Sequence, residues 1–447
     1  MSNLLNEAEP LLHSPSDDEY SQTDPAKATR DRYRALARFA GCCISALSTG
    51  WHDGCIGALI PYLQLYYGIS DEKVSLVFIG SFTGYILASL LNVTLNNRLG
   101  VGRLILLGAG LQGLASAITA CRPPFIAIAI SYALAGFGVA NQDAQFNTYV
   151  ARLPGAATKL GVMHAIYGVG ALSSPILATL LMQARIVPPL FYLTNVAWCA
   201  VTITVLLVGF EFRGSNPSPE LSQTAEREQR VAPLKTVLSS RAVWPMLLFV
   251  VLYTGTETTE SGWVVSFLMR VRNGGVMSGY ASAAFYAGLT SSRVVLLPLT
   301  AWITEKRAVT LYSLIAIATQ VVVWTSPLFL VDFIAVAACG FVMGPVYPIT
   351  VSLVTKATPR EYHPGALSLM ACFGMSGSAI FPFVVGSLAD RYSIRVLQPV
   401  LVSLFTTMML VWQLVPSPRA ALRRSLLGSK PASVDGSENS ASVGSSI

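Results

Sequence analysis

The sequence contains few charged residues. Only 12% of its 447 residues are Asp, Glu, Lys or Arg, whereas 53% are hydrophobic. A typical soluble domain carries about 25% charged residues, so this scarcity excludes an ordinary soluble protein and indicates an integral membrane protein. The net charge of +7 does not indicate nucleic-acid binding. The basic residues lie in short segments between apolar runs, where they set membrane orientation rather than bind phosphate.

Motifs of common enzymes and pumps are also missing. The sequence has no phosphate-binding P-loop, no hydrolase nucleophile elbow, and no His or Cys set with the spacing of zinc ligands. Its seven cysteines lie in or beside apolar runs, and we interpret them as small packing residues. We therefore expect no enzymatic activity, no bound metal and no cofactor other than an ion gradient, with protons favoured and sodium left open.

Long apolar runs dominate what is present and predict an all-α membrane protein. A membrane-spanning helix needs about 20 largely apolar residues. Twelve stretches qualify, at approximately 37–60, 74–95, 103–121, 124–146, 161–183, 188–209, 242–268, 277–301, 308–326, 330–354, 365–389 and 395–415.

One long polar interruption divides these spans six and six. Polar tails flank the spans. We expect these tails to be disordered, because segments of that composition cannot bury enough apolar surface to fold. The predicted organisation is a disordered cytosolic tail at 1–36, a six-helix bundle at 37–210, a cytosolic loop at 211–241, a second six-helix bundle at 242–415 and a disordered cytosolic tail at 416–447.

The distribution of basic residues predicts the orientation. The segments on the side of the termini hold 22 Lys and Arg residues, and the opposite segments hold seven. Because cytosolic segments are richer in Lys and Arg, we expect both termini in the cytosol. The amino-terminal tail also contains Glu7, Leu11 and Leu12, which resemble an acidic dileucine sorting signal. A vacuolar or lysosomal membrane, reached through sorting adaptors, and the plasma membrane both remain open.

The two halves of the chain repeat. Gly84 recurs as Gly288, and Gly136-Phe137 recurs as Gly340-Phe341; five such matches share offsets between 204 and 206 residues. The repeat predicts two pseudo-symmetric bundles of common origin, an arrangement used for alternating access.

The fourth span carries a polar run from Asn141 to Asn147 that includes Asp143. Lipid cannot satisfy such groups, so this helix must face protein or a polar cavity. Asp143 and Asn147 share one face at helical spacing. The first span contains a second acid, Asp53, beside His52. An acid inside a membrane suggests function, whereas His52 is equally well explained as a hydrogen-bonded interior histidine or as a proton relay.

Further candidates follow in the fifth, seventh and eighth spans. His164 shares a stripe with small residues, so it either contacts the solute or titrates with Asp143, with a histidine that caps a neighbouring carbonyl as the alternative. Tyr167 offers a ring face and a hydroxyl suited to a sugar, although packing in the core explains a single ring more simply. Glu257 and Glu260 share a stripe of the seventh span, which continues to Trp263. Arg293 is the only basic residue deep in a span. We expect it to be the counter-ion of Glu257 or Glu260. For Arg293 and Glu260 the alternative is an internal clamp with no role in transport.

Taken together and in order, these motifs resemble the major facilitator superfamily, and within it the fucose permease-like sugar symporter branch with its sodium-glucose-transporter-like eukaryotic relatives. The matching motifs are Gly50-Trp-His-Asp-Gly54, Asp143-Ala-Gln-Phe-Asn147, His164-Ala-Ile-Tyr-Gly168, Tyr253 to Trp263 with Glu257, Phe285-Tyr-Ala-Gly288 with Arg293, and Gly340 to Pro348.

The resemblance implies the roles of several residues. It implies that Asp53 and Asp143 take part in proton coupling and substrate binding, joined by His164 and Tyr167. The chain departs from the branch at His52, where asparagine is more usual, and this leaves hexose specificity open.

The combined expectation is a secondary active transporter that moves a small polar solute, most simply a sugar, with protons. An uncoupled facilitator, a sodium-coupled carrier and a non-transporting nutrient sensor are the alternatives. The expected partners are the solute, the lipid bilayer and the sorting adaptors, with no nucleic acid. We expect the protein to act as a monomer.

Overall fold

The computed structural model describes residues 25–210, 234–240 and 243–415, and within these ranges it contains helices and no β-strand. Both ends of the chain and most of the predicted central loop lie outside the described residues. The predicted sorting residues Glu7, Leu11 and Leu12 lie there too.

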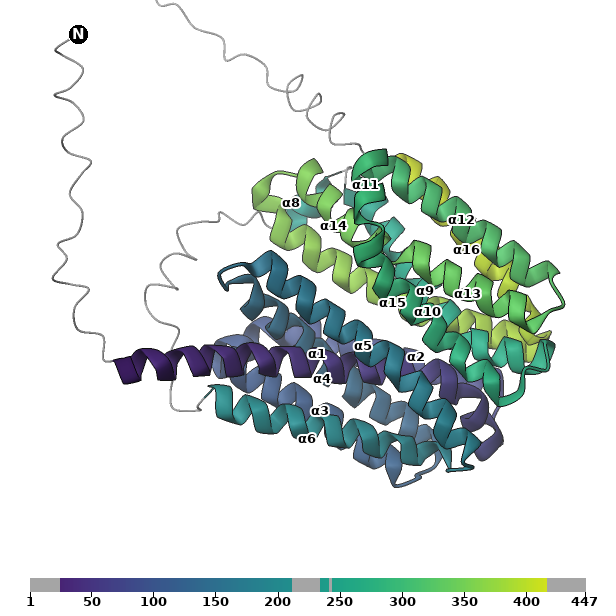
Figure 1. The fold of residues 1–447 in the computed structure, drawn as a ribbon, viewed down its shortest axis with the longest axis horizontal. Helices are drawn as coiled ribbons and strands as arrows, with labels where there is room; N and C mark the ends of the chain where they lie inside the picture. The colour runs from purple at the N-terminus through teal and green to yellow at the C-terminus, as the bar shows by residue number, and fades with distance from the viewer. Residues whose placement is uncertain (1–24, 211–233, 241–242, 416–447) are drawn as a thin grey trace, which may run out of the picture.

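Six long helices form the amino-terminal half (Figure 1). They are α1 (Pro25–Tyr67), α2 (Asp71–Leu99), α3 (Val101–Ala120), α4 (Phe125–Ala151), α5 (Ala156–Gln183) and α6 (Tyr192–Phe210), with a 3₁₀ turn at Pro188–Phe191 before α6. The start of α1 corrects the sequence prediction, because residues 25–36 are helical and continue the first span instead of belonging to a disordered tail.

The carboxyl-terminal half contains more breaks. Its helices are α8 (Leu234–Ser239), α9 (Val243–Val271), α10 (Gly279–Val295), α11 (Leu297–Ile303), α12 (Glu305–Thr325), α13 (Phe329–Met343), α14 (Val346–Ala357), α15 (His363–Arg391) and α16 (Leu397–Leu414), with 3₁₀ turns at Gly275–Ser278, Arg360–Tyr362 and Ile394–Val396. The predicted spans at 277–301 and 330–354 are each divided in two. Each break lies beside a proline, Pro298 or Pro345, which lacks the N–H that would continue the helix.

These helices supply twelve membrane-spanning segments. Among the described residues, nine helical segments are long and apolar enough to cross a membrane. The other three spans are α1 and α9, whose centres are made polar by residues such as Asp53 and Glu257, and α10, which has 17 residues and is followed by α11 after the break. Polar groups at the centre of a span mark a protein interior or a functional site rather than a helix outside the membrane.

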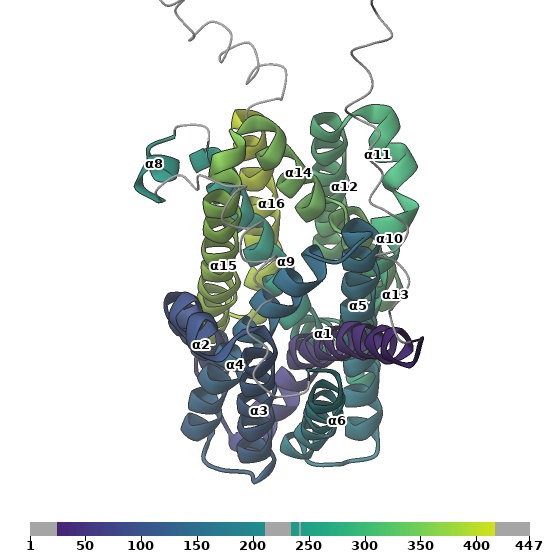
Figure 2. The same ribbon diagram turned by 90° about the vertical axis from the view of Figure 1, so that its left-hand side faces the viewer.

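The two halves pack in equivalent ways. In the amino-terminal bundle, α1 packs on α5 and α6, α2 on α4, and α3 on α4 and α6. In the carboxyl-terminal bundle, α9 packs on α15 and α16, α10 on α13, and α12 on α13 and α16. The contacts between the bundles repeat as well, since α2 packs on α15 and α5 on α10. Figures 1 and 2 show the two groups of helices side by side, so the predicted pseudo-symmetric pair of bundles is confirmed.

The repeated glycines explain part of this symmetry. Gly84 of α2 lies against the carbonyl of Ala133 in α4, and its counterpart Gly288 of α10 lies against the carbonyl of Ala337 in α13. A Cβ at either position would collide with that carbonyl oxygen. Small residues let membrane helices approach closely, so the matched glycines hold equivalent helix pairs together.

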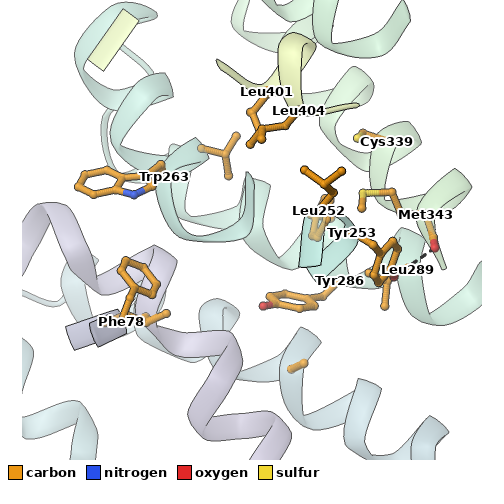
Figure 3. Packing of buried hydrophobic residues seen from close by; sticks show 14 of the residues in the cluster. Phe78, Leu252, Tyr253, Trp263, Tyr286, Leu289, Cys339, Met343, Leu401 and Leu404 are labelled. Carbon is orange, nitrogen blue, oxygen red and sulfur yellow. Dashed lines mark hydrogen bonds between the residues drawn. The ribbon is translucent and has the colours of Figure 1, made fainter. Parts of the chain in front are cut away.

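The bundles contact each other closely at one end. We call the end where α6 and α16 finish the terminal side, and the end where α1 and α9 finish the far side. Near the far side, Gly57 meets the carbonyl of Ser261, and a Cβ on Gly262 would come within 2.9 Å of the Phe78 ring. Figure 3 shows Phe78 facing the helix that carries Trp263.

An ion pair adds to this closure. Both terminal nitrogens of Arg270, at the end of α9, donate to the carboxylate of Asp71, at the start of α2. Gln64 of α1 donates to Asp71 across 2.6 Å and accepts from Arg270 across 3.0 Å. Gln183, at the end of α5, also donates across the bundles, to Met277 and Tyr280. Among the described residues, all the hydrogen bonds that join the two bundles therefore lie on the far side. The far side is therefore closed in this conformation.

Candidate functional site

Three acidic side chains lie near one another where the bundles meet. They are Asp53 of α1, Asp143 of α4 and Glu257 of α9; Asp53 interacts electrostatically with each of the other two. Each keeps part of its surface exposed although it lies near the middle of a span. The arrangement follows from the packing of α1 against both α4 and α9. It brings together three of the sequence-predicted residues.

Each of these acids has a tyrosine partner. The Tyr167 hydroxyl of α5 donates to Asp53 Oδ2 across 2.9 Å, and the Tyr85 hydroxyl of α2 donates to Asp143 Oδ2 across 3.1 Å. In the other bundle, Tyr253 lies within hydrogen-bonding reach of Glu257. Hydrogen bonds to an ionised acceptor are stronger than those between neutral groups. Tyr167 and Tyr85 therefore fix the directions in which the Asp53 and Asp143 carboxylates point.

Tyr85 and Tyr253 were not among the sequence-predicted residues. The signal that could have found them is the need of a carboxylate inside a membrane for a donor. A tyrosine in an apolar run cannot be distinguished by its sequence position alone from a ring that only packs. Tyr253 packs inside the carboxyl-terminal bundle, where its hydroxyl donates to the Met343 carbonyl across 3.3 Å (Figure 3).

Arg293 of α10 faces this group of acids from the carboxyl-terminal bundle. It interacts electrostatically with Glu257 and Tyr253 of α9, and with His164 of α5 in the opposite bundle. His164 is exposed and Arg293 is partly exposed. The predicted counter-ion relation thus involves Glu257 rather than Glu260.

Glu260 lies elsewhere. It is fully buried inside the carboxyl-terminal bundle, and neither of its carboxylate oxygens accepts a hydrogen bond of ordinary geometry from a described residue. Its polar neighbours are the Gln320 side chain of α12 and the Cys339 thiol of α13. Glu260 is therefore separated from the group formed by Asp53, Asp143 and Glu257, although it follows Glu257 by one turn.

Two further sequence-predicted residues are not brought to the acids, and a third stays beside Asp143. His52 is buried inside the amino-terminal bundle, where its ring lies 5.4 Å from the Tyr132 ring and its Nδ1 lies 3.4 Å from Asn195. Trp263 is fully buried and donates to the Pro382 carbonyl across 2.9 Å. Asn147 is the third; it is partly exposed on the face of Asp143 and donates to the backbone carbonyl of that residue, one turn earlier on α4.

The other polar residues of α4 form a network within the amino-terminal bundle. Gln142 donates to Gln112 across 2.7 Å and accepts from Ser45 across 2.8 Å, while Gln145 donates to Asn92 across 2.9 Å. These bonds give the amides partners that lipid could not supply, although the Gln145 Oε1 atom is left without a partner among the described residues. The polar run of α4 is thus divided, since its glutamines hold the bundle together and Asp143 interacts with Asp53 of α1.

The family model of the Major Facilitator Superfamily matches residues 42–382. The chain belongs to this superfamily. It is a multi-pass membrane transporter and not an enzyme. It is similar to Bypass of stop codon protein 6 of Saccharomyces cerevisiae (strain ATCC 204508 / S288c), at 27% identity over 415 residues, which cover 84% of this chain and 81% of the yeast protein.

Solved structures of the superfamily share the fold. A bacterial homolog of the human lysosomal transporter Spinster, in an inward-facing and unoccupied conformation, gives a TM-score of 0.71 at 13% identity, over 90% of this chain and 99% of that one. The nucleoside transporter NupG gives a TM-score of 0.67 at 11% identity, over 85% of this chain and 99% of that one. The transporter FucP in its outward conformation gives a TM-score of 0.58 at 15% identity, over 85% of this chain and 98% of that one. At these identities the likeness shows the fold alone.

Proposed function

We propose that this transporter moves a small polar solute, most simply a sugar, together with protons, and that it belongs to the fucose permease-like branch. The observation that supports the proposal is the group of three neighbouring, partly exposed acids between the bundles. Carboxylates that lie close together in a poorly hydrated site repel one another, so the site favours occupation by a proton or another cation.

Alternating access provides the mechanism. The far side is closed by contacts such as the Arg270–Asp71 pair, and we take this conformation as the state whose site opens toward the terminal side. With both termini in the cytosol, as the Lys and Arg distribution favours, it is the inward-facing state. Rocking of one bundle against the other would break the far-side contacts and expose Asp53, Asp143 and Glu257 to the opposite compartment.

The tyrosines around the acids support a hydroxyl-rich solute. Tyr347 is partly exposed, and its ring centroid lies 5.9 Å from that of Tyr253. Tyrosine offers both an apolar ring face and a hydroxyl group, and sugars present both kinds of surface. His164 and Tyr167 complete the proposed site from α5. His52 and Trp263, which are buried, would then support the helices rather than contact the solute, and Asn147 would line the site beside Asp143.

The deciding experiment is uptake of labelled hexoses, polyols and amino acids into proteoliposomes, with and without a proton or a sodium gradient. Accumulation of a solute that follows the pH gradient supports the proposal. Uptake that only equilibrates the solute indicates a facilitator, and uptake that follows sodium indicates the sodium-coupled alternative. Saturable binding without uptake under any gradient indicates a nutrient sensor.

The membrane in which the protein acts is a separate proposal. We place it in the vacuolar or lysosomal membrane, through recognition of Glu7, Leu11 and Leu12 by sorting adaptors. Microscopy of the double variant Leu11→Ala, Leu12→Ala should then show the protein at the cell surface. An unchanged location would contradict the sorting role.

A further inference from the structure

We propose that the solute carries an anionic group, a carboxylate or a phosphate, and that Arg293 binds it. The proposal rests on the transport function proposed above and narrows its substrate class to acidic polar solutes such as sugar acids. It starts from a guanidinium whose donors are unused. Arginine has five N–H donors, yet Arg293 donates no hydrogen bond to any described residue, and its Nε is buried without a partner.

Three other arginines of the chain donate hydrogen bonds to carboxylates, amides or backbone carbonyls of the protein itself. Arg272 donates to Asp332 across 2.5 Å and to the Val323 carbonyl across 2.7 Å, and it lies over the Phe267 ring. Arg38 donates to the Gly209 carbonyl across 3.0 Å and lies over Phe210. Arg270 donates to Asp71 and Gln64. Arg293 makes none of these contacts, so a purely structural role leaves its donors unexplained.

The position of Arg293 makes it reachable by a solute. Its electrostatic neighbours come from both bundles, Glu257 and Tyr253 from α9 and His164 from α5. The closing contacts lie on the far side, at Asp71 and Arg270. A solute that enters between the bundles from the terminal side therefore meets the guanidinium. The planar guanidinium binds carboxylates and phosphates through two parallel hydrogen bonds.

The opposite bundle suits the rest of such a solute. Asp53 and Asp143 each accept one tyrosine hydroxyl, and an ionised carboxylate has about four acceptor positions, so both can accept hydroxyl groups as well. A neutral sugar can accept single hydrogen bonds from Arg293 but brings no charge to pair with the guanidinium, whereas a carboxylate or phosphate accepts two parallel bonds and supplies that charge. A polyhydroxy acid satisfies the acids with its hydroxyl groups and Arg293 with its anionic group.

Glu257 connects anion binding to proton binding. In the empty site its carboxylate is the negative neighbour of Arg293. When Glu257 takes up a proton, that negative charge disappears, and an incoming anion replaces it beside the guanidinium. The proton taken up at Glu257 thus offsets the negative charge of the anion beside Arg293.

The test is uptake of matched neutral and acidic solutes into proteoliposomes: glucose with glucuronate, galactose with galacturonate, and glycerol with glycerate, together with glucose 6-phosphate. The wild type, Arg293→Lys and Arg293→Gln are compared with Arg391→Gln as control, because Arg391 is exposed at the end of α15. We expect an acidic member to be transported. Its KM should rise about tenfold or more in Arg293→Gln, equivalent to about 1.4 kcal/mol, less in Arg293→Lys, and not in the control.

The outcomes separate this inference from the proposed function. Transport of a neutral member with the same KM in wild type and Arg293→Gln overturns the anion site and leaves solute transport standing. If no solute moves under any gradient, the transport function itself fails, and the inference with it. Should Arg293→Gln fail to fold, judged by size-exclusion chromatography and thermal melting, Arg293→Lys decides: an unchanged KM for the acidic solute overturns the anion site.

Discussion

The Tyr167 hydroxyl donates to the Asp53 carboxylate across 2.9 Å and so joins α5 to α1 within the amino-terminal bundle. Tyr85 and Asp143 repeat this relationship between α2 and α4. Both acids of the amino-terminal bundle are therefore held by a tyrosine from a neighbouring helix. A carboxylate held in this way keeps one oxygen bonded and has further acceptor positions for a proton or a solute.

Replacing Tyr167 with Phe tests the importance of this contact. The substitution removes the donor and keeps the ring, so Asp53 should lose its fixed orientation while the bundle stays folded. Hydrogen bonds to charged groups contribute about 1.5–3 kcal/mol, so we expect solute uptake at low concentration to fall by about tenfold or more. The exposed Tyr392 provides the control through Tyr392→Phe. Equal uptake by wild type and Tyr167→Phe would show that the hydrogen bond has no role in transport.

Replacing Asp143 with Asn should abolish accumulation driven by a pH gradient. The amide has nearly the same shape but cannot take up and release a proton at Asp143. Its effect on stability should be small, because the network of Gln142 and Gln145 stays intact. Accumulation in proteoliposomes and thermal melting are the measurements, with Asp390→Asn at an exposed position as control. Concentration of solute by Asp143→Asn at the parental level would remove Asp143 from the coupling mechanism.

Much of the fold and part of the candidate site could be predicted from the sequence. The apolar runs located the spans, and a carboxylate in a span is costly enough that its position alone suggested an interface for Asp53, Asp143 and Glu257. Neighbours in sequence were less informative. A residue next to an acid points about 100° away on a helix; thus His52 lies inside the amino-terminal bundle while Asp53 faces the other acids.

Other features depend on tertiary contacts that spacing does not specify. Glu257 and Glu260 share a stripe, and only the packing of α12 and α13 shows that Glu260 faces Gln320 and Cys339 rather than Arg293. Trp263 belongs to the same motif as Glu257 but lies six residues on, about 240° around the helix, where it packs beside Pro382. The sequence pattern identifies the residue types on each face of a helix, but it does not specify which neighbouring helices those faces contact.

The glycine pair Gly84 and Gly288 predicts a symmetrical response to substitution. In Gly84→Ala and in Gly288→Ala the added Cβ meets the carbonyl of Ala133 or Ala337 at the equivalent helix crossing. Overpacking of this kind costs about 1–3 kcal/mol, so both variants should melt at lower temperature than the parent and by similar amounts. Gly110→Ala on α3 is the matched control, because a Cβ there meets nothing within 4 Å. A lower melting temperature in only one of the pair would contradict structural equivalence of the two crossings.

The Arg270–Asp71 pair predicts how the conformational equilibrium can be shifted. Asp71→Asn removes the charge that holds α2 to α9 on the far side and leaves the folded interior of each bundle unchanged. Removing one partner of a buried ion pair costs about 3–5 kcal/mol. Because Arg270 is 39% exposed, we expect a smaller shift toward the state that opens on the far side, of about 1–2 kcal/mol.

Spin labels on Lys73→Cys and Arg395→Cys, at exposed far-side positions of the two bundles, should therefore report a longer distance in Asp71→Asn. The exposed Cys121 and the partly exposed Cys372 are replaced first, so that only the introduced cysteines react. The exchange Asp71→Arg with Arg270→Asp restores opposite charges and should return the distance distribution toward that of the parent. A distribution that is the same in the parent and in Asp71→Asn would mean that the apolar contacts of Gly262 with Phe78, rather than the ion pair, hold the far side closed.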